Sequence, residues 1–207
     1  MNNITRYYEI PGFGDFDKIY KELISALPDT ASILELGVAF GRGTWAMLDA
    51  MRSDMSLYVL DFFNYNTYNF FLCAIDSGTM PYTSNLDYDA FKELSMIRSH
   101  REMFLHCVSQ HSKYCQLQTV YTMSSELYIE YKHRPVYDLV FLDGDHSYDR
   151  VKQELAYFKD CTVIAGHDYG NHTCPGVKQA VDEFMADHSD RSLRIFDDQL
   201  VFVLNKV

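Results

Sequence analysis

Two short polar clusters follow apolar stretches in the second half of the chain, and they hold residue types suited to acid–base chemistry. Residues 143–146 (Asp-Gly-Asp-His) follow the apolar run 139–142, and His167 and Asp168 follow the run 162–165. Asp and His in succession are poor core residues. A histidine has an ordinary pKa near 6.5, so His146 can take a hydroxyl proton near neutral pH. The plainer alternative is that His146 begins a helix and bonds to a carboxylate.

A glycine-rich segment in the first half of the chain predicts a ligand-binding turn. Residues 33–44 read Ile-Leu-Glu-Leu-Gly-Val-Ala-Phe-Gly-Arg-Gly-Thr, with glycines at 37, 41 and 43. Glycines at these positions allow a tight strand-to-helix turn and a close approach of ligand to backbone. The spacing GxxxGxG differs from the GxGxxG of turns that bind a dinucleotide pyrophosphate. Taken alone, such a turn could serve only to pack a helix on a sheet.

An acidic residue follows the glycine turn at a distance typical of nucleoside-binding sheets. Asp61 stands near the end of the apolar run 57–62, 18 residues after Gly43. A carboxylate at the carboxyl end of the second strand can accept both hydroxyls of a ribose. A lone Asp at a strand end is more commonly a turn or helix cap, but its position after the glycine turn favours the ribose interpretation.

Together these motifs resemble the class I methyltransferases, which use S-adenosylmethionine. That cofactor has no pyrophosphate and carries an amino-acid group, whose ammonium an acidic residue at position 35 would suit. The resemblance implies that cofactor-binding residues are Glu35, Gly37, Val38, Gly41, Gly43, Thr44, Asp61, Phe62, Ser124, Ser125 and Asp143. Ser124 and Ser125 would lie near the adenine, although serine is also a common helix cap.

The polar clusters at 143–146 and 167–168 resemble one branch of this class, the small-molecule O-methyltransferases that act on catechols, caffeoyl-coenzyme A or antibiotic sugars. In that branch acids at these positions hold a divalent metal, usually Mg²⁺, which orients the substrate hydroxyl. The resemblance implies Asp143 and Asp168 as ligands, with His167 as an imperfect third, because histidine suits magnesium less well than oxygen ligands do. It also implies His146 or Asp145 as the catalytic base.

These motifs require a sheet that brings the strand ends together. Apolar runs alternate with helical patterns, which predicts a doubly wound α/β fold. We expect helices at 15–27, 44–51, 126–131, 148–158 and 175–188, and strands at 32–38, 57–62, 117–121, 136–142 and 162–165. Runs at 193–196 and 200–204 predict a hairpin. By resemblance, the expected architecture is a Rossmann-like seven-stranded sheet of order 3-2-1-4-5-7-6 with a C-terminal antiparallel hairpin.

The middle of the chain matches no motif. Residues 64–85 are expected to form a long loop or a partly ordered insertion, and 87–113 a long helical stretch, continuous or broken once. Segments of this kind are often lids or binding segments, so 64–115 is interpreted as an insertion that faces the substrate. No linker or repeat divides the chain, and we expect one domain over residues 1–207.

Composition limits the possible partners. The net charge of −11 argues against a nucleic-acid substrate, because a phosphate backbone would be repelled. No apolar run approaches the roughly 18 residues of a membrane span, and the N-terminus does not read as a signal peptide. Five cysteines without a CxxC pair favour reduced thiols in a cytoplasmic protein. We expect a small-molecule substrate. The aromatic-rich insertion could serve as a lid or as the contact surface of a homodimer.

The resulting interpretation is S-adenosylmethionine-dependent methyl transfer to a hydroxyl of a sugar, phenol or similar compound, with or without the assistance of a divalent metal. Three alternatives stay open at this point. One is a methyltransferase that has a nitrogen acceptor or needs no metal. Another is a nicotinamide-dependent oxidoreductase, against which the glycine spacing speaks. The third is a noncatalytic protein that kept the fold, which fold alone never excludes.

Overall fold

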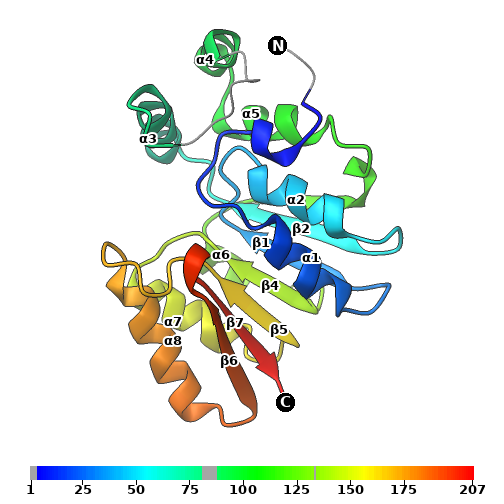
Figure 1. The fold of residues 1–207 in the computed structure, drawn as a ribbon, viewed down its shortest axis with the longest axis vertical. Coiled ribbons are helices and arrows are strands. Elements are labelled where there is room, and N and C mark those ends of the chain that lie inside the picture. The colour runs from blue at the N-terminus through cyan, green and yellow to red at the C-terminus, as the bar shows by residue number, and fades with distance from the viewer. Residues whose placement is uncertain (1–3, 81–87, 133) are drawn as a thin grey trace.

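The computed structural model describes residues 4–80, 88–132 and 134–207, and within them seven strands form one mixed sheet (Figure 1). The strands are β1 (Ser32–Leu36), β2 (Ser56–Asp61), β3 (Leu117–Thr122), β4 (Leu139–Leu142), β5 (Val163–Gly166), β6 (Arg191–Phe196) and β7 (Val201–Lys206). Their order is β3-β2-β1-β4-β5-β7-β6. β1 to β5 run parallel, and β7 pairs antiparallel with both β5 and β6. The predicted Rossmann-like sheet and its closing hairpin are confirmed.

The described residues form eight α-helices. They are α1 (Asp17–Ser25), α2 (Arg42–Ala50), α3 (Tyr65–Asp76), α4 (Tyr88–Ile97), α5 (His100–Val108), α6 (Ser125–Glu130), α7 (Tyr148–Tyr157) and α8 (Pro175–Asp187). One buried core lies between the sheet and α1, α2 and α5, and another lies between the sheet and α6, α7 and α8. β4 and β5 are buried along their whole length, which explains their unbroken apolar sequence. The helix ends predicted for α1, α2, α6, α7 and α8 are right to within two residues.

The prediction of a loop at 64–85 is wrong for residues 65–76, which form α3. Asn64 caps this helix by accepting a hydrogen bond from the Thr67 amide at 2.8 Å. Tyr68 and Ile75 bury themselves in a third cluster with Phe40 of the glycine turn. Tertiary burial therefore outweighs the weak helix propensity of Asn, Tyr and Thr. Residues 81–85 of the predicted loop lie outside the described residues.

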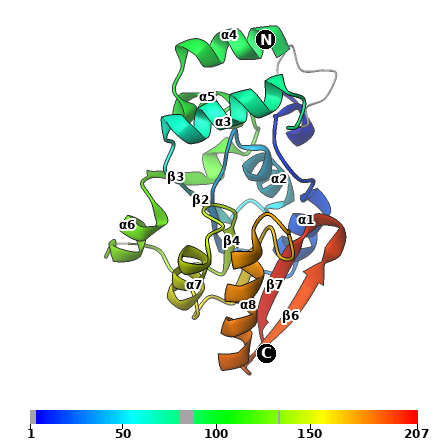
Figure 2. The same ribbon diagram turned by 90° about the vertical axis from the view of Figure 1, so that its left-hand side faces the viewer.

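Of the two forms expected for the helical stretch 87–113, the broken one is confirmed, although residue 87 lies outside the described residues. α4 ends at Ile97, and α5 begins after Ser99, which forms a capping box with Glu102. α3, α4 and α5 gather at the end of the molecule beyond the glycine turn (Figure 2). Among the described residues, no helix is long and apolar enough to cross a membrane.

The strand predicted at 136–142 begins too early. Val136 is 91% exposed, and β4 starts only at Leu139. The cause is Asp138, whose carboxylate accepts a hydrogen bond from the Ser32 amide at 2.9 Å and ties the approach of β4 to the start of β1. Similarly, the strand expected at 32–38 ends at Leu36, where the glycine turn begins.

Candidate active site

The glycine turn connects β1 to α2 at the carboxyl edge of the sheet. Gly37 has a φ of +76°, and a Cβ there would lie 2.0 Å from the carbonyl oxygen of Asp143 on the neighbouring strand end. Gly41 has a φ of +94° and is the N-cap of α2. A side chain at either position is disfavoured by the left-handed backbone and by close contact of its Cβ with neighbouring atoms. The sequence therefore fits a turn packed tightly between β1, β4 and α2.

Glu35 lies beneath this turn with 3% of its surface exposed. Its carboxylate accepts a hydrogen bond from the Thr44 hydroxyl at 2.5 Å, and Gly43 leaves room for it, since a Cβ there would lie 2.4 Å from Oε1. Burial raises the pKa of Glu35 to about 8, against the opposing effect of the Thr44 hydrogen bond. The described contacts of Glu35 thus support the turn from within, and its predicted role toward an ammonium group stays a prediction.

Asp61 ends β2 and holds the glycine turn in place. Its two carboxylate oxygens accept hydrogen bonds from the amides of Val38 at 2.9 Å and Phe63 at 2.7 Å. A carboxylate oxygen can accept more than one hydrogen bond, so both oxygens keep capacity for ribose hydroxyls. The adjacent Phe62 is 58% exposed, an unusual exposure for a large apolar ring. Asp61 and Phe62 therefore remain open to a ligand at this edge.

His100 contacts the glycine turn and is a residue that the sequence motifs did not single out. Its Nε2 donates to the carbonyl of Ala39 in the glycine turn at 2.9 Å, and its ring stacks on Tyr68 at 5.3 Å. Burial lowers the pKa of His100, so the ring is neutral. It ties α5 to the turn across 61 residues of sequence. No local motif marks it, since it lies in the segment 64–115 that matched nothing.

Ser124 and Ser125 lie at the start of α6. The Ser124 hydroxyl accepts a hydrogen bond from the Leu127 amide and is the N-cap of the helix. The capping role that the sequence left open is therefore real. It neither requires nor excludes the adenine contact, which stays a prediction.

The structure brings the two polar clusters together at the carboxyl ends of β4 and β5. The Nδ1 of His146 lies 2.8 Å from Asp168 Oδ2, and its Nε2 lies 3.4 Å from Asp143 Oδ1. The Nδ1 of His167 lies 3.2 Å from the same oxygen of Asp143. Two carboxylates thus alternate with two imidazoles over a part-buried patch, as expected for strand ends that share one edge of the sheet.

The charges in this patch change the interpretation of His146 as a base. Burial lowers its pKa, but the neighbouring carboxylates of Asp143 and Asp168 outweigh burial and raise the pKa to about 11. Burial by itself would raise the pKa of Asp168. Hydrogen bonds from His146 and Asn171 outweigh burial and lower the pKa to about 2. His146 therefore carries a proton at neutral pH in this arrangement. Asp145 is exposed and accepts a hydrogen bond from the Ser147 amide at 2.9 Å.

A small pocket opens beside His146 and contains a carboxyl group that the sequence analysis missed. Its lining includes Gly144, Asp145, His146, Glu154 and His167. Glu154 of α7 is 2% exposed, and its Oε1 has no hydrogen-bond partner. Burial raises the pKa of Glu154 to about 7. Its sequence position on a helix gave no signal, because an isolated helical Glu is ordinarily exposed.

The predicted metal ligands Asp143, His167 and Asp168 do meet, each with one donor atom within 4.8 Å of the others. Magnesium, however, prefers an octahedron of oxygen ligands. The group offers only two carboxylates, and an imidazole nitrogen takes the third position. The proximity of the three residues fits the prediction, whereas their donor chemistry does not fit magnesium.

Comparison with proteins of known structure places the chain in the class I methyltransferase fold. The O-methyltransferase TomG of Streptomyces achromogenes, solved with S-adenosylmethionine, is 14% identical with a TM-score of 0.56 over 92% of this chain and 78% of that chain. A protein of Klebsiella pneumoniae proposed to be an O-methyltransferase is 13% identical with a TM-score of 0.59 over 96% and 83%. No protein-family model and no curated protein matches the chain.

The same fold also occurs in a protein of Clostridium thermocellum proposed to be an rRNA methylase. It is 11% identical with a TM-score of 0.54, over 95% of this chain and 99% of that chain. Identities this low establish a shared fold. The acceptor must be argued from the site, because one fold hosts many substrates.

Proposed function

We propose that this protein transfers the methyl group of S-adenosylmethionine to a hydroxyl group of a small molecule. The observation that carries the proposal is the position of two sites along one edge of the sheet. The glycine turn and Asp61 lie at the ends of β1 and β2, and the His146–Asp168 patch lies at the ends of β4 and β5. A cofactor bound at the first site would point its methyl group toward an acceptor at the second, because the carbonyl of Asp143 lies directly against Gly37.

The cofactor side of the proposal rests on Asp61, Phe62 and the glycine turn. The Asp61 carboxylate would accept the ribose hydroxyls while it continues to hold the Val38 amide. Phe62 offers an exposed ring next to that carboxylate. Methyl transfer from a sulfonium needs chiefly alignment and exclusion of water, so a rigid turn that positions the cofactor supplies much of the catalysis.

The acceptor side rests on Asp145 and His146. His146 holds a proton between two carboxylates, so in this arrangement it can donate a hydrogen bond to an acceptor but cannot deprotonate it. The exposed carboxylate of Asp145 is the better placed of the two predicted bases.

The cofactor site is tested by calorimetric titration with S-adenosylhomocysteine in the presence of EDTA. We expect saturable binding by the wild type, and a loss of affinity of at least about tenfold in Asp61→Ala. Asp54→Ala is the matched control, because Asp54 is an exposed residue in the turn before β2, and its affinity should equal that of the wild type. Thermal denaturation of each variant establishes that it is folded. Folded wild-type protein that binds no S-adenosylhomocysteine would overturn the proposal.

The acceptor is tested by a screen of hydroxyl and amine compounds with radiolabelled S-adenosylmethionine. Transfer to a hydroxyl compound, reduced in Asp145→Asn, is the expected outcome. Transfer only to amines would contradict the O-methyl assignment while leaving the cofactor assignment intact.

A further inference from the structure

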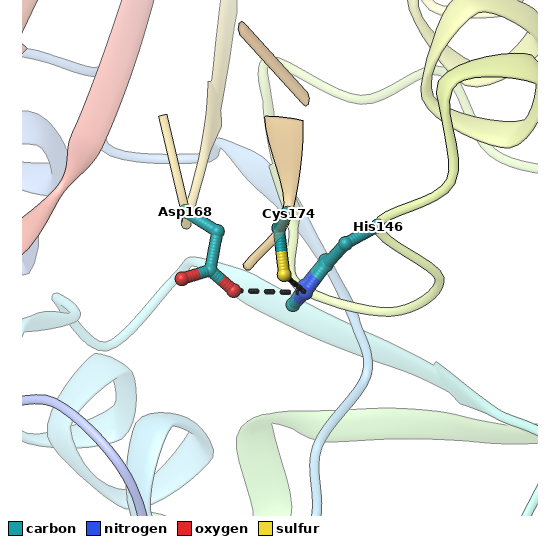
Figure 3. A group of neighbouring side chains, drawn as sticks. All are labelled: His146, Asp168 and Cys174. Carbon is teal, nitrogen blue, oxygen red and sulfur yellow. Dashed lines mark hydrogen bonds and ion pairs between the residues drawn. The ribbon is translucent and has the colours of Figure 1, made fainter. Parts of the chain in front are cut away.

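The start of α8 adds a thiol to the polar patch. One donor atom from each of His146, Asp168 and Cys174 lies within 4.8 Å of the other two (Figure 3). His146 Nδ1 is 2.8 Å from Asp168 Oδ2 and 3.7 Å from Cys174 Sγ. Figure 3 shows both contacts converging on the same ring nitrogen. Imidazole, carboxylate and thiol groups thus come together from two loops, one after β4 and one between β5 and α8.

The backbone holds two of these donors in fixed positions. Asp168 has a φ of +64°, a left-handed conformation that is uncommon for a residue other than glycine. The Asn171 amide donates to Asp168 Oδ1 at 2.6 Å, which leaves Oδ2 directed at His146. Cys174 is the N-cap of α8, directly before Pro175, which begins the helix. The arrangement therefore follows from the turn between β5 and α8 and not from mobile surface side chains.

The donor set fits zinc and not magnesium. Zinc takes sulfur, nitrogen and oxygen ligands in tetrahedral geometry, with bonds of about 2.3 Å to sulfur and about 2.0–2.2 Å to nitrogen and oxygen. Such bonds put a ligating nitrogen and sulfur about 3.5 Å apart, close to the 3.7 Å between His146 Nδ1 and Cys174 Sγ. They put a ligating nitrogen and oxygen about 3.4 Å apart, so His146 Nδ1 and Asp168 Oδ2, now 2.8 Å apart, would separate slightly on binding. Thiolate ligands also select zinc and related soft ions over magnesium.

Asp143 occupies the position of a supporting residue for such a site. It contacts the other ring nitrogen of His146, Nε2, at 3.4 Å. A histidine that binds a metal through one nitrogen ordinarily donates the other N–H to a carboxylate, which fixes the ring. Asp143 would then position His146, and would not itself be a ligand.

A cysteine nucleophile activated by His146 fits the same contacts less well. In that arrangement the thiol and the orienting carboxylate bond to opposite nitrogens of the imidazole. Here Asp168 lies closer than Cys174 to the same nitrogen, Nδ1. A carboxylate and a thiol that both approach Nδ1 fit better as ligands of one cation that Nδ1 also binds.

We propose that His146 Nδ1, Asp168 Oδ2 and Cys174 Sγ bind a zinc ion, with the fourth coordination position left open. This ligand set shares only Asp168 with the set expected from sequence. Three protein ligands and an open position are the pattern of catalytic zinc sites. An acceptor hydroxyl would fill the open position, an assignment that rests on the proposed methyl transfer, whereas the ion-binding site itself does not.

The test is titration of metal-free protein with Co²⁺, which replaces zinc and has a visible spectrum. A tetrahedral cobalt site with a cysteine ligand gives strong ligand-field bands and a thiolate-to-cobalt charge-transfer band in the near ultraviolet. We expect both in the wild type, and we expect one equivalent of Zn²⁺ to abolish them while a large excess of Mg²⁺ does not. Cys174→Ser should lose the charge-transfer band. Cys115→Ser, which changes an exposed cysteine outside the group, should keep it.

A second variant separates ligands from supporting residues. Asp143→Asn should weaken Zn²⁺ binding by roughly 10- to 100-fold, measured by competition with a chelator, while the charge-transfer band keeps its shape. Loss of the band in Asp143→Asn, its survival in Cys174→Ser, or its displacement by Mg²⁺ would each overturn the proposal. Titration of the same samples with S-adenosylhomocysteine keeps the two proposals distinguishable. Cobalt binding without cofactor binding would support the metal site and reject methyl transfer. Cofactor binding without cobalt binding would reject the metal site and leave the methyl-transfer proposal standing.

Discussion

Residues at the glycine turn have structural contacts that determine their protonation state. Glu35 is enclosed by Thr44, Gly43 and the strand beneath it, and it feels the negative charges of Asp61 and Asp143. A buried carboxyl group in such surroundings favours its neutral form. Glu35, one of the residues that the motif marks, is therefore also a residue whose ionisation the fold resists.

The raised pKa of Glu35 predicts a pH-dependent contribution to stability. The unfolded chain releases this proton near pH 4.3, whereas the folded protein keeps it up to about pH 8. Stability from Glu35 is therefore greatest below pH 4.3, falls by up to about 1.4 kcal/mol per pH unit as pH rises between the two values, and is constant above pH 8. Glu35→Gln should remove this slope.

Urea unfolding of the wild type and of Glu35→Gln at pH 5, 6, 7 and 8 measures the effect. The variant should gain stability relative to the wild type as pH rises, because other titrating groups, including Glu154, are common to both proteins. Free energies of unfolding that stay parallel across this range would show that Glu35 is already ionised in the folded protein.

At the scale of elements, the turn between β1 and α2 is where the strands and the site meet. Gly37 donates its amide to Leu60 of β2, and its Cα faces the carbonyl of Asp143 after β4. Three neighbouring strands thus converge on one residue. A change there should disturb both the fold and the proposed cofactor site.

Gly37→Ala is expected to destabilise the protein by on the order of 3 kcal/mol or more, and to weaken S-adenosylhomocysteine binding. Left-handed backbone costs a residue with a Cβ roughly 1–2 kcal/mol, and the 2.0 Å contact with Asp143 adds to this. Gly78→Ala is the matched control, with a φ of +72° and nothing within 4 Å of the added Cβ. Chemical denaturation measures both. If Gly37→Ala and Gly78→Ala lose the same free energy of unfolding, the contact with Asp143 adds no destabilisation.

The charge of the whole molecule bears on the acceptor. The chain carries a net charge of −11, while one protein of the same fold is proposed to be an rRNA methylase. Binding to a phosphate backbone gains most of its affinity from Lys and Arg that displace counterions. A strongly negative protein lacks that driving force, so we predict that RNA is not a substrate.

Fluorescence anisotropy with a labelled RNA hairpin at about 0.15 M salt tests this prediction. We expect no binding at protein concentrations up to about 10 μM, where non-specific RNA-binding proteins already bind. A basic RNA-binding protein measured in parallel shows that the probe responds. Salt-sensitive binding by the present protein would instead reveal a basic face hidden by the average charge.

The sequence by itself determined the sheet and the edge at which the site lies. Buried parallel strands read as apolar runs, and glycines must occupy positions such as Gly37 where a Cβ cannot fit. Because parallel strands end at the same edge, the polar residues after β4 and β5 were expected to meet each other at the edge where Asp61 also lies. Local chemistry and strand direction suffice for a doubly wound sheet with a polar edge, whereas the order of the seven strands was expected from the resemblance to class I methyltransferases.

Only the tertiary structure decided which side chains touch within that edge. His100 reaches Ala39 across 61 residues, and Cys174 reaches His146 across 28, through packing that no local pattern encodes. α3 forms because Tyr68 and Ile75 find Phe40, not because their own segment favours a helix. The protonation of Glu35, Glu154 and His146 likewise depends on burial and on neighbours brought from distant segments, so it could be known only after the chain had folded.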